Sequence, residues 1–314
     1  MSKIRAVVVK PDAPARLALD TIEAPALAPS SALVSVAAIS LNRGEVRRTQ
    51  NDPAGARPGW DLSGVVEQAA ADGSGPPVGS RVVGFLPGGA WAERVAVPTH
   101  ALAVLPDAVS FAQAATLPVA GLTALMGLEK AGSLLDRTVL ITGASGGVGD
   151  FAVQLARAAG ATVVALVRSL TRADRVREAG AHTVVSGVDA TVAAPYGPYD
   201  LLFDGVGGEV LASGLSLLAP DGMAVAYGRT TGATVTFDLG QFFGRGGLSL
   251  YGFILFHEVR RQPASVGLAR LVALVAAKRL HPYITIETSW TDIGTVAQQL
   301  LDREYPGKAV LLVD

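Results

Sequence analysis

Apolar and polar positions in the 314-residue chain change their spacing about a third of the way along. Before Ser110 the apolar residues form short runs, separated by Pro, Gly and Asp clusters such as 72–79, a pattern typical of β-strands joined by turns. The expected strands are Ala6–Val9, Ala32–Ile39, Gly64–Gln68, Arg81–Phe85 and Ala92–Val97. This part of the chain is therefore predicted to be a compact, β-rich domain.

From Ser110 the apolar residues take helical spacing, with Ser110 as the N-cap of a helix over 111–117 and a second helix over 122–131. Strands and helices then alternate. Strands are expected at 138–142, 162–167, 183–185, 200–204, 223–227 and 249–253, and helices at 150–159, 173–179 and 209–218. This alternation predicts an α/β fold with a parallel, doubly wound sheet, in which the loops after the strands share one edge.

The last segments no longer alternate in this way. We expect a helix over 264–278, a strand over 284–287, a helix over 293–302 and a final strand over 309–313. The tail is therefore predicted to return to the first domain. The predicted organisation is a catalytic domain from 1–117, a nucleotide-binding domain from 118–258, and a returning segment from 259–314.

Composition excludes several classes of protein. The chain has 26 basic and 27 acidic side chains without a basic stripe, so nucleic acid is not an expected partner. It has no cysteine, which excludes disulfides and thiolate zinc sites. No apolar run is long enough to span a membrane, and the N-terminus does not resemble a secretory signal. We expect a soluble, cytoplasmic protein.

A glycine-rich turn, Gly143-Ala-Ser-Gly-Gly-Val-Gly149, follows the apolar run that starts at Thr138. Glycines allow the backbone to turn tightly and approach a pyrophosphate, which the N-terminus of the next helix stabilises. We therefore expect Ser145, Gly146, Gly147 and Val148 to bind the phosphates of a dinucleotide.

Basic residues occupy the place where an NAD-binding unit has an acid for the ribose 2′-hydroxyl. Arg168 and Ser169 end the next predicted strand, and Arg172 lies four residues after Arg168. Their side chains suit a 2′-phosphate, which predicts NADPH as the cofactor. The alternative is that both arginines only coat a solvated helix start.

Several segments in a fixed order resemble one family. They are Leu41-Asn-Arg-Gly-Glu45, Pro58-Gly-Trp-Asp-Leu-Ser-Gly64, Val78-Gly-Ser-Arg-Val82, Gly121-Leu-Thr-Ala124 and the glycine turn itself. Over nearly its full length the chain resembles zinc-independent medium-chain reductases of the quinone oxidoreductase type. The resemblance implies a Rossmann doubly wound parallel sheet inserted in a β-rich, GroES-like catalytic domain.

The same resemblance implies hydride transfer from NADPH to a quinone or an α,β-unsaturated ketone. Zinc alcohol dehydrogenases usually have glycine where this chain has Ala144, and Gly-His-Glu where it has Gly59-Trp60-Asp61. We therefore expect no bound metal. The shared edge of the sheet adds seven residues to the expected cofactor site, and the resemblance also supports the last six of them: Asp204, Tyr227, Gly228, Arg229, Phe253, Ile254 and Leu255.

Two residues are candidates for the catalytic centre by resemblance. Asn42 matches an asparagine that faces nicotinamide and substrate, so its amide is expected to donate to a substrate carbonyl; otherwise it only ends a strand. Thr123 stands where members of the family approach the nicotinamide end of the cofactor. The alternative is that its hydroxyl only bonds back to a carbonyl of its own helix.

Arg47 and Trp60 are candidates for the substrate pocket, although a surface position for Arg47 and core packing for Trp60 are the simpler expectations. Arg47 stands where many relatives have tyrosine, which leaves the proton donor open. Lys308 is a further candidate for a phosphate contact.

The sequence thus predicts an NADPH-dependent enoyl or quinone reductase that acts on a small molecule. The alternatives are a ketone reductase and a low-turnover NADPH-binding sensor or structural protein. Because the stretch Leu248–Phe256 is apolar and related folds often pair through a sheet edge, we expect a homodimer.

Overall fold

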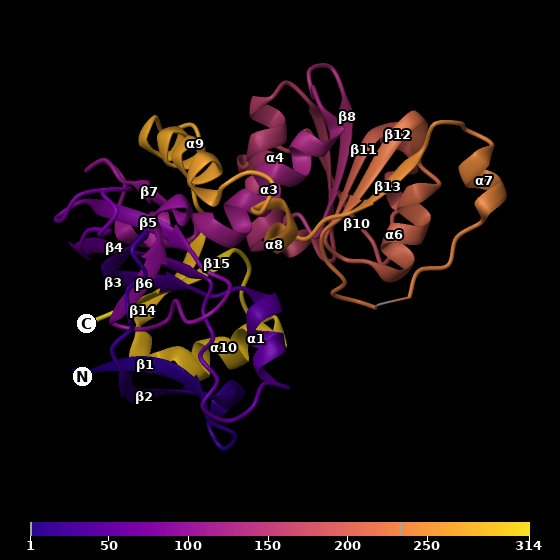
Figure 1. Ribbon diagram of the computed structural model, residues 1–314. Helices are drawn as coiled ribbons and strands as arrows, with labels where there is room; N and C mark the ends of the chain where they lie inside the picture. Colours follow the sequence, from indigo (N-terminus) through magenta and orange to yellow (C-terminus); the bar gives the residue numbers. More distant parts are fainter. Residues whose placement is uncertain (1, 233) are drawn as a thin grey trace. The chain divides into compact units, whose positions relative to one another are not determined.

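The computed structural model describes residues 2–232 and 234–314, and the chain divides into two compact units. The first comprises the N-terminal segment through Leu122 together with Val259–Asp314, and the second comprises Thr123–Glu258. The sequence placed boundaries after residues 117 and 258, so the second coincides with this division and the first lies five residues earlier. Figure 1 shows the elements of each unit.

The first unit is built around a seven-stranded sheet with the order β14-β15-β3-β4-β5-β7, in which β6 also pairs with β3. Its strands are β3 (Ser31–Ser40), β4 (Asp61–Gln68), β5 (Arg81–Phe85), β6 (Arg94–Pro98), β7 (Leu102–Val104), β14 (Ile284–Ser289) and β15 (Lys308–Leu312). Strand β15 lies antiparallel to β3 and pairs Val310 with Ser40. The end of the chain therefore contributes a strand next to β3 of the N-terminal sheet.

A hairpin and four α-helices complete the described part of this unit. The hairpin is β1 (Lys3–Val9) and β2 (Leu17–Glu23), and the helices are α1 (Arg43–Thr49), α2 (Phe111–Ala115), α9 (Ala264–Ala276) and α10 (Ile293–Asp302), with α3 (Leu122–Leu128) starting at the boundary. The core contains two tryptophans, Trp91 and Trp290, that are almost completely buried. The N-cap predicted at Ser110 is confirmed, because Gln113 N–H donates to Ser110 Oγ at 3.1 Å.

The second unit contains a six-stranded sheet in the order β10-β9-β8-β11-β12-β13, and all its strands are parallel. Its strands are β8 (Thr138–Thr142), β9 (Thr162–Val167), β10 (Thr183–Ser186), β11 (Tyr199–Asp204), β12 (Leu218–Ala226) and β13 (Ser249–Gly252). The helices are α4 (Gly147–Ala158), α5 (Ala173–Glu178), α6 (Gly208–Leu215), α7 (Leu239–Phe243) and α8 (Leu255–Glu258). This confirms the predicted doubly wound sheet inserted in a GroES-like domain.

Burial explains why the central strands of this sheet are continuous apolar runs. Val139, Leu140 and Ile141 in β8 have no exposed surface, and neither do Leu201 and Leu202 in β11. A parallel strand covered on both faces needs apolar side chains at successive positions. Because all six strands are parallel, their carboxyl ends lie at one edge of the sheet, where ligands bind in such sheets.

Some predicted elements differ from the structure. The sequence missed β2, β7, α1, α7 and α8, and it ended α6 three residues late, at Leu218 rather than Leu215. Leu218 instead opens strand β12, which was predicted to begin at Met223. A π-helical turn, Leu117–Gly121, follows α2, and it contains Pro118.

Candidate active site

The glycine turn joins β8 to α4 in the second unit and is shaped by close backbone approach. A Cβ atom at Gly149 would lie 2.4 Å from the Gly143 carbonyl oxygen and 2.6 Å from Ala144 Cα, so only glycine fits. Gly143 has a positive φ of 60°. Ser145–Val148 are partly exposed at the N-terminus of the 12-residue helix α4. The first N–H groups of a helix have no acceptor within it, which suits a phosphate.

The predicted 2′-phosphate residues lie directly after β9. Arg168 and Ser169 are exposed, and Arg172 is partly exposed. Ser169 Oγ accepts the backbone N–H of Thr171 at 3.3 Å and thereby caps the 3₁₀ turn Leu170–Arg172. The turn holds both arginines next to the strand end.

An ion pair that the sequence did not reveal fixes the helix after this turn. Arg175 on α5 donates from Nε and Nη2 to the Asp150 carboxylate of α4, at 3.0 and 3.1 Å. Gln154 Nε2 donates to the same carboxylate at 2.7 Å. Asp150 is visible in the sequence as an acid in the first helical turn, but nothing local identifies its partner 25 residues later.

Asp204 requires a correction. Its side chain is fully buried and accepts hydrogen bonds from Thr142 Oγ1 at 2.5 Å and from Gly207 N–H at 2.8 Å. Burial raises the pKa of Asp204 above the ordinary aspartate value, although these hydrogen bonds oppose the shift. Its carboxylate therefore shapes the loop after β11 and does not face a ligand.

Tyr227 and Gly228 support the same edge by packing. The Tyr227 ring stacks on Phe203 with the ring centres 4.5 Å apart, and burial raises the pKa of its hydroxyl. A Cβ atom at Gly228 would lie 2.5 Å from the Gly205 carbonyl oxygen, so this glycine lets two loops approach. Arg229 is exposed and stays available to a ligand.

The segment after β13 is divided between core and surface. Phe253 and Leu255 are 3% and 5% exposed, whereas Ile254 is 62% exposed. Of the three predicted cofactor residues, only Ile254 offers its side chain to a ligand. Contact by Phe253 and Leu255 is limited to their backbone.

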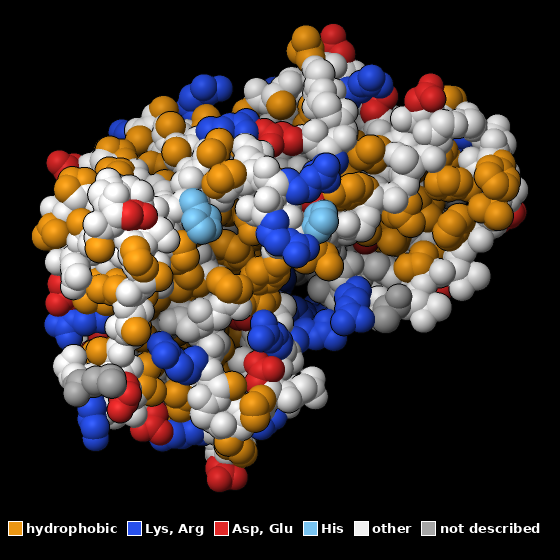
Figure 2. Space-filling view, in the orientation of Figure 1, with side chains coloured by type: hydrophobic (Ala, Val, Ile, Leu, Met, Phe, Trp, Pro, Cys, Tyr) orange, Lys and Arg blue, Asp and Glu red, His pale blue; other side chains and the backbone are white. Residues whose placement is uncertain are grey.

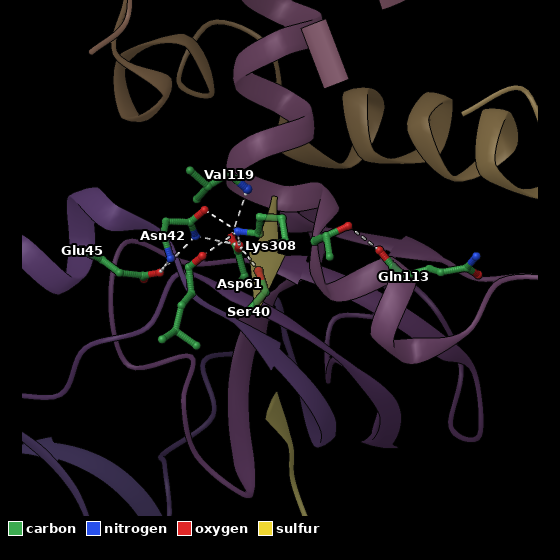
Figure 3. Close-up of polar contacts among 9 residues, drawn as sticks. Ser40, Asn42, Glu45, Asp61, Gln113, Val119 and Lys308 are labelled. Carbon is green, nitrogen blue, oxygen red and sulfur yellow. Dashed lines mark hydrogen bonds and ion pairs between the residues drawn. The ribbon is translucent and has the colours of Figure 1, made fainter. Parts of the chain in front are cut away.

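The first unit contains a polar cluster made of the buried residues Ser40, Glu45, Asp61 and Lys308 and the partly exposed Asn42, shown in Figure 3. Asp61 opens β4, and its Oδ2 accepts Ser40 Oγ at 2.6 Å and Asn42 Nδ2 at 2.7 Å. Its Oδ1 accepts the backbone N–H of Val119 at 3.0 Å, so Asp61 also holds the π-helical turn.

Lys308 enters this cluster from β15. Its Nζ donates to Asn42 Oδ1 at 2.6 Å and to the Leu41 carbonyl oxygen at 2.8 Å, and it lies 3.4 Å from Asp61 Oδ2. Burial lowers the pKa of Lys308, and the charge of Asp61 opposes that shift. The side chain is 3% exposed, so the predicted phosphate contact is wrong.

The amide of Asn42 has no hydrogen left for a substrate. One Nδ2 hydrogen goes to Asp61, the other goes to Glu45 Oε1 at 3.0 Å, and the amide oxygen accepts from Lys308. In this structure Asn42 therefore orders the cluster, and its donation to a substrate carbonyl stays a prediction. Asn42 is also the N-cap of α1, where Glu45 Oε1 accepts its backbone N–H at 2.8 Å.

A small pocket of about 20 Å³, room for about one water molecule, lies beside α1. Glu45 and Arg48 of α1 line it, together with Asp52 from the turn after the helix, Arg57 and Trp60. Trp60 lies beside this pocket, and its contact with a substrate stays a prediction, whereas Arg47 is exposed on another face of α1. Thr123 is 6% exposed at the second position of α3, and its catalytic role stays a prediction.

The side chains at the position of a catalytic zinc do not suit that metal. Trp60 has no lone pair for a metal, and Asp61 is already engaged by Ser40, Asn42 and Lys308. Across residues 2–232 and 234–314, no three His, Asp or Glu side chains gather in a way that suits a metal ion. Nor does any helix in this described part have the length and apolarity to cross a membrane.

A parallel Rossmann-type sheet with a glycine turn, together with a GroES-like β domain, defines the class of nicotinamide-dependent oxidoreductases. Residues 147–270 match the family model of zinc-binding dehydrogenases, and residues 28–107 match that of the alcohol dehydrogenase GroES-like domain. The chain belongs to the medium-chain dehydrogenase/reductase family.

Three similar proteins illustrate this relationship. The solved quinone oxidoreductase from Coxiella burnetii is 26% identical, with a TM-score of 0.85 over 100% of both chains. A mycobacterial protein solved in complex with NADPH is 25% identical, with a TM-score of 0.86 over 98% of this chain and 99% of that one. The 2-methylene-furan-3-one reductase of Solanum lycopersicum is 31% identical over 59% of this chain and 52% of that enzyme.

Proposed function

We propose that the protein is an NADPH-dependent reductase that transfers hydride, without a metal, to a quinone or an α,β-unsaturated ketone. The glycine turn at the carboxyl edge of a parallel sheet is the observation that carries this proposal. Similar proteins described as a quinone oxidoreductase and a furanone reductase support the substrate classes. The cofactor supplies the hydride. The protein binds and orients the cofactor and the substrate, and it excludes water from the site.

NADPH is favoured over NADH by the residues after β9. Arg168 follows the end of β9 directly and Arg172 ends the 3₁₀ turn after it, so two guanidinium groups lie near the strand end, and Ser169 adds a hydroxyl. No acidic residue occupies that position to receive a free 2′-hydroxyl. The mycobacterial neighbour was solved with NADPH, which agrees with this choice.

Metal independence follows from the chemistry of the side chains in the first unit. An indole stands where a zinc dehydrogenase has a ligand histidine, and the neighbouring carboxylate already neutralises a buried lysine. A conjugated acceptor needs no Lewis acid as strong as zinc, because the charge that develops is delocalised over the enolate.

We also propose a homodimer that forms through β13. This strand is at the edge of the sheet, where backbone N–H and C=O groups are open to a second strand. The neighbouring surface is apolar: Leu239, Phe243 and Leu250 are all exposed, and Figure 2 shows hydrophobic side chains over α7 and β13.

The function is tested by following the absorbance of NADPH with a small panel of acceptors. A naphthoquinone and phenyl vinyl ketone should both be reduced, whereas acetophenone, an isolated ketone with the same ring, should not. Consumption of NADPH with acetophenone, but with neither of the other two acceptors, would favour the ketone reductase. Tight NADPH binding without consumption of any acceptor would favour a sensor or structural protein and sink the proposal.

A further inference from the structure

A largely buried ion pair in the second unit joins the helix of the glycine turn to the helix that follows the predicted 2′-phosphate residues. Asp150 follows Gly149 directly in the first turn of α4, and it is 3% exposed. Arg175, the third residue of α5, places two guanidinium nitrogens on its carboxylate, at 3.0 and 3.1 Å. Gln154 Nε2 donates to the same carboxylate. The first turns of α4 and α5 are thereby fixed to each other.

The apolar packing of α5 is slight, which makes this contact important for its position. The helix has six residues, and the buried ones are Ala173 and Val176. A helix of this length is not stable in isolation, so its place depends on tertiary contacts. Separating a buried carboxylate from its partner leaves an uncompensated charge, which is strongly destabilising. The pair between Asp150 and Arg175 is therefore a strong constraint on where α5 begins.

Arg172 is attached directly to this constrained point. It is the N-cap of α5 and the last residue of the 3₁₀ turn, three positions before Arg175. The other end of the turn follows Val167, the last residue of β9, and Ser169 caps the turn itself. The backbone that carries both predicted 2′-phosphate arginines is thus fixed from two sides, by the sheet and by Asp150.

We propose that Asp150 and Arg175 are positioning residues that set the selectivity for NADPH over NADH. This inference rests on the proposed function. The pyrophosphate binds at the N-terminus of α4, and the 2′-phosphate binds at Arg168 and Arg172. Both phosphates belong to one ligand, so the spacing between their two sites decides whether both are bound at once. The ion pair sets that spacing because it joins the starts of the two helices.

The charges of the pair, acting alone, would have a different effect. A carboxylate behind the glycine turn repels phosphates, and a guanidinium attracts them. On that account Asp150→Asn favours the extra phosphate of NADPH, whereas Arg175→Met disfavours it. A positioning role predicts the same sign for both variants, because either change breaks the same contact. The two substitutions alter the net charge in opposite directions, so they separate the two accounts.

The readout is the ratio of NADPH affinity to NADH affinity, measured by calorimetric titration. A change that acts only on the pyrophosphate or on the amount of folded protein affects both cofactors and cancels in this ratio. In both Asp150→Asn and Arg175→Met the ratio should fall about fivefold or more. The double variant should lose no more than the single variants, since the contact is already broken in each of them.

Two further variants serve as controls. Asp174→Asn makes the same change of charge as Asp150→Asn, but Asp174 is an exposed residue of α5 paired with Arg177 at 2.7 Å, so the ratio should stay within about twofold of the wild type. Arg175→Lys keeps the positive charge and decides the matter if another variant fails to fold. A lysine cannot place two nitrogens on the carboxylate, so the ratio should fall by about threefold or more.

Three results overturn the inference while leaving the proposed function intact. They are a ratio that rises in Asp150→Asn, a ratio that equals the wild-type value in both Asp150→Asn and Arg175→Met, and an Arg175→Lys variant that keeps the wild-type ratio. A wild-type protein that binds NADPH and NADH with equal affinity would instead contradict the proposed choice of cofactor itself.

Discussion

At the scale of single residues, the cofactor choice depends on two guanidinium groups at the end of β9. Arg168 and Arg172 belong to a strand end and a 3₁₀ turn that Ser169 caps, so their backbone positions are fixed before any ligand arrives. Preorganised cations lose little entropy when they bind a phosphate. The proposed preference for NADPH is therefore a local property of these two side chains.

Changing Arg168 and Arg172 to alanine should weaken NADPH binding by at least about tenfold per arginine, because each loses a charge-assisted bond to the 2′-phosphate. NADH affinity should change by less than about twofold. Calorimetric titration of both cofactors measures this. Arg177→Ala is the control, since Arg177 is an exposed arginine of the same region paired with Asp174. Equal losses for NADPH and NADH would remove the 2′-phosphate assignment.

Single residues also show where the sequence was insufficient. The local pattern Asn42-x-x-Glu45 contained the capping box, but Lys308, which completes the cluster, is more than 260 positions away. No local pattern reports such a contact. Asp204 was expected at the ligand because it ends a central strand, and its burial depends on Thr142 from the neighbouring strand.

At the scale of elements, the spacing of apolar residues predicted the strands of the parallel sheet well, because they are continuous apolar runs. It missed α1, whose segment Arg43–Thr49 has Val46 as its one large apolar residue. This helix exists because Asn42 and Glu45 cap it and because its buried face packs in the first unit. Strand β2 was missed because its side chains do not alternate regularly between buried and exposed positions, which is the pattern that indicates a strand.

The edge strand β13 leads to a prediction about assembly. Leu250→Lys should convert the dimer to monomer, because a dimer that pairs β13 with its symmetry mate would bring two lysines together at the interface. Val188→Lys is the control, since Val188 is an exposed apolar residue that follows β10, the opposite edge strand. Light scattering over a range of concentrations measures the mass. A wild-type protein that is monomeric at every concentration would contradict the dimer.

At the scale of the whole molecule, the chain combines a sheet that can hold a dinucleotide with a β domain that buries a charged cluster. The order of segments predicted both parts, since it alternates strands and helices only between the two β-rich ends. What the order could not supply is the hydrogen bonding of that cluster. That depends on which oxygen of Glu45 has a partner and which amide hydrogens of Asn42 are already used.

The most direct test of the central claim is the fate of a labelled hydride. NADPH deuterated at C4 of the nicotinamide, on the transferred side, is incubated with phenyl vinyl ketone in ordinary water, and the product is examined by mass spectrometry and NMR. The account predicts phenyl ethyl ketone with one deuterium on the carbon β to the carbonyl and only hydrogen on the α-carbon. A reduced product without deuterium at the β-carbon, or no reduced product, would contradict it.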